Sequence, residues 1–241
     1  MQENIIKNQV IIRGMLVGRS VHDNRTTLVV CSQSQNKDHS NYQYISFEGK
    51  LKQDVDSNYE LHDMVTVQAS VQIFRTREEK LVSSQNIRLH GIGIEKTRDF
   101  TKRVIAQSGI PIYGIQIKDC VRFDFSGTIA SIQKTAKSDQ RLSVLLRVQQ
   151  DNRDGYNLIP LMYNCRPGQS ADDILAQHHK GTQVCVRGFV AQRKNPNAQE
   201  SRKVQYINTY YITSFLHSTV DIQIDEDAVV DTVAEAVPIQ Q

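Results

Sequence analysis

The sequence predicts a mainly β protein with two tandem five-stranded barrels, a short helix between them and a disordered acidic C-terminal tail. Two observations predict this organisation: strand-like alternation recurs in the same order in both halves, and the charge is strongly segregated along the chain. The 241 residues are 39% hydrophobic, and the mean hydropathy is −0.44. Two cores of roughly 100 residues each suit such a chain better than one large core.

Strand-like segments fill the first half. The segment 64–74 alternates strictly, with Val65, Val67 and Ala69 on one face and polar residues on the other. A period of two is typical of a strand with one buried face. Further strands are expected at 10–17, 27–31, 42–51 and 83–94.

The second half repeats this order, and Gly127 lies in its first strand where the first half has Gly14. Between its third and fourth strands, Ser170 can cap a helix and Gly181 follows the end of that helix. Asp172 and Asp173 fall in the first turn of the same helix. Five strands with a connector between the third and the fourth are typical of the OB-fold, a Greek-key barrel. The strands of this half are expected at 123–132, 141–148, 156–163, 182–191 and 204–215.

This order predicts the domain boundaries. We expect a first OB-fold at 1–96, a linker with a short helix at 97–120 and a second OB-fold at 121–218. Residues 219–241 hold few large apolar side chains and charges of one sign, so we expect them to be disordered.

Net charge is only +3, and this average hides two regions of opposite sign. Six of the 26 acids lie after residue 219, where there is no Lys or Arg; residues 1–219 therefore hold all 29 bases against 20 acids, an excess of nine. A basic body is typical of proteins that bind polyanions. The six acids are Asp221, Asp225, Glu226, Asp227, Asp231 and Glu235.

Several classes of site are missing from the sequence. There is no phosphate-binding loop and no dinucleotide fingerprint. His178 and His179 are adjacent, so on a helix they point in different directions and do not predict a metal site. The four cysteines are far apart in the sequence, which favours buried reduced thiols over a disulfide or zinc framework. We expect no enzyme, no cofactor and no metal.

Membrane and export signals are also missing from the sequence. No apolar run approaches the roughly 20 residues of a membrane helix. The first residues lack the basic and apolar regions of a secretory signal. We therefore expect a cytoplasmic protein that does not bind a membrane.

Basic loops interleaved with aromatic residues are the positive signal for function. Proteins that bind single strands combine a positive groove with rings on which bases stack, and OB-folds use strands two and three with two neighbouring loops. Ile45, Phe47 and Leu51 share one phase, so Tyr42 and Tyr44 should point outward. The residues selected in the first half are Arg19, Arg25, Tyr42, Tyr44, Phe74, Arg75, Arg77 and Lys80.

The second half offers cations at equivalent loops. Tyr156 and Tyr163 have opposite parity, so only one of them can face outward on a regular strand. Phe189 lies on the outward phase of its strand beside Arg187. The residues selected here are Lys134, Lys137, Arg141, Tyr156, Arg187, Phe189, Arg193, Lys194, Arg202, Lys203 and Tyr206.

With this strand order, the two early glycines and an acidic tail, the chain resembles bacterial and phage single-stranded DNA-binding proteins that carry two OB-folds. The resemblance implies that the tail recruits replication and repair proteins, although this chain lacks the terminal Phe of that family. It also lacks Trp, so Tyr and Phe must provide the stacking. The tail residues concerned are Asp225, Glu226, Asp227, Pro238 and Ile239.

Three functions stay open at this point. The first is sequence-tolerant binding of single-stranded DNA in replication, recombination, repair or conjugative transfer. The second is RNA binding, because OB-folds serve both polymers. The third is a structural adaptor in a nucleoprotein complex. Two barrels per chain also allow a homodimer with four barrels, or a higher homo-oligomer.

Overall fold

The computed structural model describes residues 8–33, 40–73, 87–97, 121–136, 138–149, 155–194 and 206–216. Within these ranges the chain is mainly β, which confirms the predicted class. The first half forms β1 (Gln9–Val21), β2 (Arg25–Gln33), β3 (Ser40–Glu48), α1 (Gly49–Asn58), β4 (Met64–Ile73) and β5 (Ile87–Lys96). The second half forms β6 (Val121–Thr135), β7 (Ser138–Gln149), β8 (Tyr156–Asn164), α2 (Ala171–Gln177), β9 (Gln183–Lys194) and β10 (Tyr206–Leu216).

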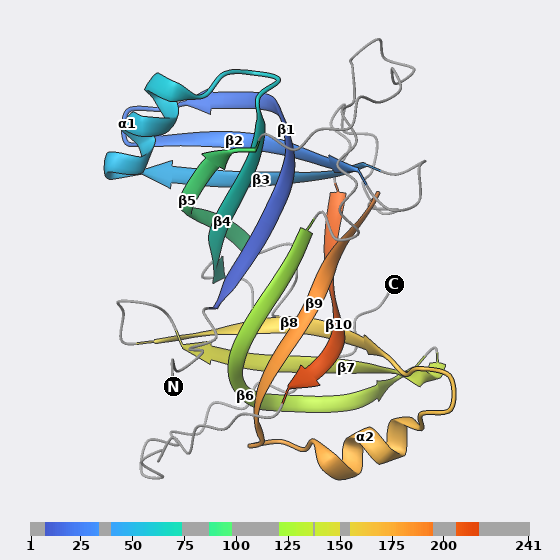
Figure 1. Cartoon of the computed structure of the whole chain (residues 1–241). Coiled ribbons are helices and arrows are strands. Elements are labelled where there is room, and N and C mark those ends of the chain that lie inside the picture. Colours follow the sequence, from blue (N-terminus) through green and yellow to red (C-terminus); the bar gives the residue numbers. More distant parts are fainter. Residues whose placement is uncertain are drawn as a thin grey trace, which may run out of the picture.

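The strands pair in two closed rings. In ring 1, backbone pairing runs from β1 through β2, β3, β5 and β4 back to β1, and only β3 and β5 are parallel. In ring 2, it runs from β6 through β7, β8, β10 and β9 back to β6, and only β8 and β10 are parallel. Figure 1 shows ring 1 above ring 2, with β1 and β6 approaching each other between them.

Alternate residues along the strands point to the same face, and the apolar ones form the core. Val65, Val67 and Ala69 are fully buried on β4, as their shared phase predicts. The buried side chains of both rings form one contiguous hydrophobic cluster. The rings are therefore joined by packing as well as by the chain.

Gly14 and Gly127 mark the same structural position in the two rings. Gly14 pairs with Val65, and Gly127 pairs with Val184. A Cβ atom at Gly14 would lie 2.2 Å from the carbonyl oxygen of Cys31, and one at Gly127 would lie 2.3 Å from that of Arg147. Only a residue without a side chain allows the neighbouring strand to come this close.

Helix α1 replaces the end of a predicted strand. The prediction that the third strand continues to Leu51 is wrong, because β3 ends at Glu48 and α1 begins at Gly49. Gly49 adopts a φ of +57°, which turns the chain out of the strand. Lys52 and Asp56 then form an i,i+4 ion pair on the helix, and Val55 is buried.

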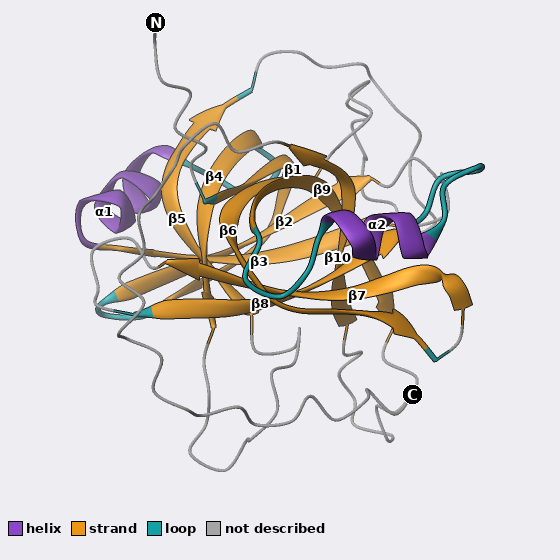
Figure 2. Cartoon of the chain, turned by 90° about the horizontal axis from the view of Figure 1, so that it is seen from below, coloured by secondary structure: helices purple, strands orange, loops and turns teal. Residues whose placement is uncertain are grey.

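Helix α2 agrees with its sequence signals. The Ser170 hydroxyl accepts a hydrogen bond from the backbone N–H of Asp172, so Ser170 caps the helix as predicted. Figure 1 and Figure 2 together show α1 on the outside of ring 1 and α2 on the outside of ring 2. The helix predicted at 97–107 lies outside the described residues except for Thr97, and the domain boundaries stay predictions.

The rings meet through β1 and β6, which pair antiparallel from Gln9–Asp124 to Ile12–Val121. Strand β3 of ring 1 also contacts β9 of ring 2, where the side-chain amide of Asn41 donates to the Val190 carbonyl. We call these contacts, together with those between β8 and β4, the junction. Through it, the strands of both rings belong to one ten-stranded sheet.

Candidate nucleic-acid interface

Exposed tyrosines lie on the third strand of each ring. Tyr44 on β3 is 59% exposed and Tyr156 on β8 is 47% exposed. Tyr44 stands opposite Val29 on β2, so it lies on the outer face of strands two and three. Tyr163, of opposite parity to Tyr156, is buried. The predicted outward direction of Tyr44 is confirmed, and Tyr42 is half-buried.

A guanidinium group covers one face of the Tyr156 ring. The Cζ atom of Arg147 on β7 lies 4.0 Å from the ring centroid. Tyr156 pairs with Gln149, so Arg147 is its diagonal neighbour across the two strands. Cation–π contacts of this kind fix the position of a ring. The exposed remainder of the ring is a platform on which a base could stack.

Arg147 is not among the residues predicted from the sequence, although the sequence contains a signal for it. Leu142, Val144, Leu146 and Val148 are buried on β7, so the alternation places Arg147 on the outer face. Its partner on β8 could be found only from the register.

A second pair of rings lies on β9 and β10. Phe189 is 38% exposed, as its outward phase predicts. Its ring stacks on Tyr211, with centroids 5.3 Å apart and planes at 19°. Exposed Arg122 stands opposite Phe189 in the β6–β9 register. Phe189 and Tyr211 therefore lie on the fourth and fifth strands of ring 2, whereas Tyr156 lies on the third.

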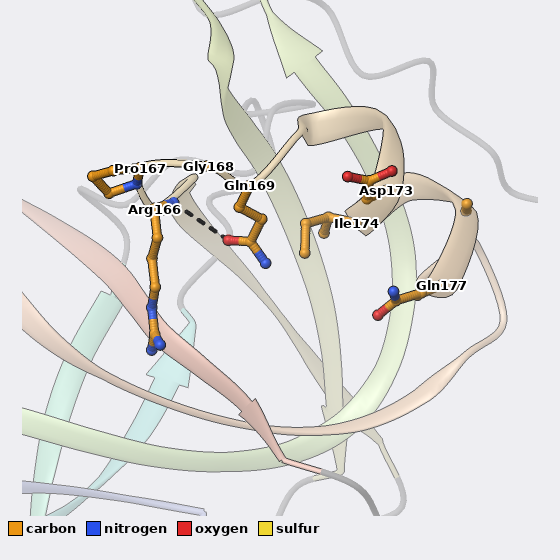
Figure 3. Close-up of a pocket in the computed structure, with 8 residues that line it drawn as sticks. Arg166, Pro167, Gly168, Gln169, Asp173, Ile174 and Gln177 are labelled. Carbon is orange, nitrogen blue, oxygen red and sulfur yellow. Dashed lines mark hydrogen bonds between the residues drawn. The ribbon is translucent and has the colours of Figure 1, made fainter.

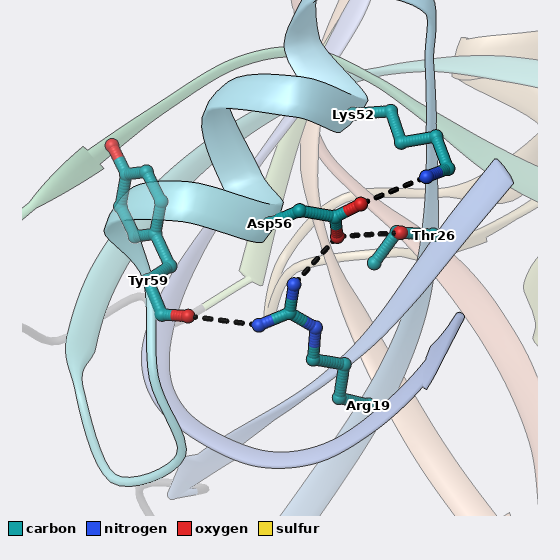
Figure 4. A network of polar contacts seen from close by, with 5 residues as sticks. All are labelled: Arg19, Thr26, Lys52, Asp56 and Tyr59. Carbon is teal, nitrogen blue, oxygen red and sulfur yellow. Dashed lines mark hydrogen bonds and ion pairs between the residues drawn. The ribbon is translucent and has the colours of Figure 1, made fainter.

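Arg19 is part of a polar network at the base of α1 (Figure 4). Its guanidinium donates to Asp56 and to the carbonyl of Tyr59, and the Thr26 hydroxyl also donates to Asp56. The hydrogen bond from Lys52, together with those from Thr26 and Arg19, lowers the pKa of Asp56 to about 2. Arg19 therefore holds α1 against β1, and a role for it in DNA binding stays a prediction.

Other predicted cations also have protein partners. Lys134 pairs with Asp172 at 2.8 Å, and Arg187 pairs with Asp124 at 2.6 Å. The hydrogen bond that Lys134 donates to Asp172 raises the pKa of its ammonium group. Arg141 donates from Nε to Asn164. These pairs are exposed, so a phosphate could compete for them at little cost.

Arg25 begins β2 opposite Glu48. Arg193 and Lys194 lie at the end of β9, which extends three residues into the loop predicted at 192–203; Tyr206 begins β10, paired with Lys194. The structure does not describe the side chains of Arg193, Lys194 and Tyr206. Wholly outside the described residues are Phe74, Arg75, Arg77, Lys80, Lys137, Arg202, Lys203 and the tail.

An open hollow of about 550 Å³ lies between the turn Arg166–Gln169 and α2 (Figure 3). The Arg166 guanidinium donates to the Thr213 carbonyl on β10, and the Gln169 side chain accepts from the Arg166 backbone. Asp173 and Gln177 line the hollow from α2. In the described part of the chain, no three His, Cys, Asp or Glu side chains gather as a metal site.

Neither protein-family models nor curated protein sequences match this chain. Among solved structures, it is similar to the wild-type single-stranded DNA-binding protein from Thermus aquaticus, with a TM-score of 0.58 and 10% identity. That alignment covers 91% of this chain and 97% of the other. A deletion mutant of the Thermus aquaticus protein gives a TM-score of 0.54 with 11% identity, over 92% and 98% of the two chains.

This chain has the fold of that single-stranded DNA-binding protein. The similarity extends over both rings, because nearly the full length of each chain is aligned. The single-stranded DNA-binding protein fold was predicted from strand order and charge, and in this respect the resemblance is confirmed. Over the ranges that the structure describes, no helix is long and apolar enough to cross a membrane.

Proposed function

We propose that the protein binds single-stranded DNA with little sequence preference and coats it during replication, recombination, repair or conjugative transfer. One observation carries this proposal: the fold of a single-stranded DNA-binding protein extends over more than nine-tenths of the chain. Each ring then acts as an OB-fold whose strands two and three contact the strand.

The outer faces of β2–β3 and β7–β8 support this proposal. Tyr44 and Tyr156 offer exposed rings, and Arg147 adds a positive charge against the Tyr156 ring. Bases of any identity have a π-face, so stacking on these rings tolerates sequence. Phosphate contacts from basic residues provide affinity without sequence information.

Fluorescence-anisotropy titration with oligo-dT, matched RNA and duplex DNA tests the proposal across a salt series. We expect oligo-dT to bind most tightly, with an affinity that falls steeply as salt rises. Preferential binding of the RNA would instead indicate an RNA-binding protein. Equal affinity for duplex and single-stranded DNA would overturn the proposal.

Tyr156→Ala should weaken oligo-dT binding by about 1–3 kcal/mol, the usual loss for one stacked base. Tyr156→Phe keeps the ring and its contact with Arg147, so it should bind like the wild type. Arg147→Ala should reduce the steepness of the salt dependence by about one counterion. Unchanged binding in both alanine variants would remove the β7–β8 face from the DNA path.

The exposed pair of Phe189 and Tyr211 has two possible partners, DNA or a second copy of the chain. Phe189→Ala separates them in one preparation, assayed by light scattering and by oligo-dT titration. Weaker binding at unchanged mass indicates DNA, whereas a smaller mass indicates a homo-oligomer that uses β9 and β10. Recruitment of replication or repair proteins by the tail also stays part of the proposal.

A further inference from the structure

The junction has an internal two-fold relation. Val10 lies four residues before Gly14 and Phe123 lies four residues before Gly127, and Val10 pairs with Phe123 across β1 and β6. A residue of ring 1 thus meets its own equivalent in ring 2. This is the geometry of an isologous dimer, here formed by two different sequences on one chain.

Two asparagines obey this relation on either side of the β1–β6 pair. Asn41 on β3 donates to the carbonyl of Val190 on β9, at 3.4 Å. Asn157 on β8 donates to the carbonyl of Val71 on β4, at 2.9 Å. Both side chains are buried. The two contacts are equivalent, so the junction consists of two matching crossings, one where β3 meets β9 and one where β8 meets β4.

The first crossing, which we call the amide crossing, contains a network of three side-chain amides. Gln43 and Asn208 exchange hydrogen bonds of 3.3 and 3.2 Å through their amide groups. Gln192 donates to Asn208 and also exchanges bonds with the backbone of Tyr42. Gln43 is fully buried. Across the junction, Gln43 thus pairs with the Asn208 amide, and the Gln192 amide pairs with the backbone of Tyr42.

The second crossing, which we call the isoleucine crossing, has isoleucine at all three equivalent positions. Counting two residues on from Asn157 and from Asn41, Ile159 corresponds to Gln43. Counting two residues on from Val71 and from Val190, Ile73 corresponds to Gln192. Ile73 pairs with Ile87 and Gln192 pairs with Asn208, so Ile87 corresponds to Asn208. Ile159 is fully buried, and Ile87 packs against the common core.

We propose that the amides at one crossing and the isoleucines at the other form a pairing code. Through this code, ring 1 pairs with ring 2 and does not pair with a second copy of ring 1. Two copies of ring 1 joined by the same two-fold would bring Gln43 at both crossings to the strand positions that Ile73 and Ile87 occupy. Two copies of ring 2 would place Ile159 against Gln192 and Asn208. Either arrangement buries amides without partners, which strongly disfavours it.

The code matters because both rings lie on one chain. A ring that could pair with its own kind would join separate chains through the junction and build open assemblies. Specificity of this sort needs a repulsive element as well as an attractive one. The mismatch of amide and isoleucine supplies the repulsion, while β1–β6 pairing and the two asparagines supply attraction common to every arrangement.

The test converts the amide crossing into a second isoleucine crossing in the full chain, with Gln43→Ile, Gln192→Ile and Asn208→Ile. Wild type and variant are refolded from urea at several protein concentrations and measured by size exclusion with light scattering. We expect one mass for the wild type at every concentration. The triple variant should form additional larger species whose share grows with the refolding concentration. A triple variant with the wild-type mass throughout would overturn the proposal.

A swapped variant is the matched control. It adds Ile159→Gln, Ile73→Gln and Ile87→Asn to the triple variant, which moves the amides to the other crossing and restores the mismatch between like rings. We expect it to regain the single wild-type mass. Larger species in the swapped variant would contradict the code, because the substitutions themselves would then cause association.

Asn208→Ile alone decides the question if the triple variant does not unfold cooperatively. In the native junction, this change places Gln43 opposite an isoleucine. When two copies of ring 2 meet, it leaves Gln192 as the one amide of the two opposite Ile159, so that pairing becomes less unfavourable. We expect a lower unfolding temperature together with a fraction of larger species. The wild-type mass distribution in this variant would overturn the proposal.

Discussion

Tyr210 on β10 buries a hydroxyl group that has no hydrogen-bond partner among the described residues. Its side chain is 1% exposed and packs against Phe123 and Phe125, and this burial raises the pKa of the phenol. A buried polar group without a partner destabilises the fold. Tyr210→Phe should therefore raise the free energy of unfolding by about 1 kcal/mol, measured by urea denaturation.

Tyr163→Phe is the matched control for this change. Tyr163 is also buried, but its hydroxyl donates to the Gln169 side chain. Removing it loses a hydrogen bond to Gln169, so stability should fall by about 1 kcal/mol. Equal effects of the two substitutions would contradict the difference in hydrogen bonding between them.

Gly14 and Gly127 should be the least replaceable glycines of the two first strands. An alanine Cβ at either position would overlap a backbone carbonyl oxygen, at 2.2 and 2.3 Å respectively. Since backbone must then move, Gly14→Ala and Gly127→Ala should each lower the free energy of unfolding by about 1–3 kcal/mol or more. Gly93→Ala, whose Cβ would meet only Gln68 at 3.7 Å, should be nearly neutral in the same denaturation assay.

Among the elements, α1 depends on the ionised Asp56 carboxylate for its attachment to β1 and β2. Its pKa is lowered from an ordinary value of 3.8 to about 2, first by the hydrogen bond from Lys52. A lowered folded-state pKa gives stability that is present above pH 4 and is lost as pH falls to 2. After allowance for solvent around this partly exposed group, the contribution is about 1 kcal/mol.

Asp56→Asn removes this pH-dependent part of the stability. Thermal unfolding followed by circular dichroism from pH 6 to pH 2 should show a lower unfolding temperature for the variant at pH 6. The difference from wild type should shrink between pH 4 and pH 2, because the wild type loses the same interaction there. A difference that stays constant over this range would contradict the role of the charge.

Among the elements, the strands could be predicted from the sequence, but not all of their ends could be. Strict alternation predicted β4 and the outward direction of Tyr44 and Phe189, because these properties follow from the two-residue period alone. Helix α1 was missed, since Leu51 continued the apolar phase of β3 and only Gly49 marked the turn. The ion pairs of Arg19 and Arg187 could not be predicted, because each joins strands or helices that meet only in the folded chain.

At the scale of the whole molecule, the opposite charges of the body and the tail affect the proposed binding of DNA. Residues 1–219 have an excess of nine positive charges, and the remainder holds six acids without a base. Such a tail can compete with DNA phosphates for the basic body. The competition is electrostatic, so it should weaken as salt shortens the Debye length from about 30 Å at 0.01 M to about 8 Å at 0.15 M.

Deletion of residues 220–241 should tighten oligo-dT binding at low salt and have little effect at high salt, because screening then removes the competition. Anisotropy titrations of the full chain and the deletion variant over the same salt series measure this difference. A full-length variant with the six acids replaced by Asn and Gln separates charge from length, and should bind like the deletion variant. If deletion alone tightened binding, tail length rather than charge would be responsible. Identical affinities of the full and shortened chains at low salt would show that the tail does not compete with DNA.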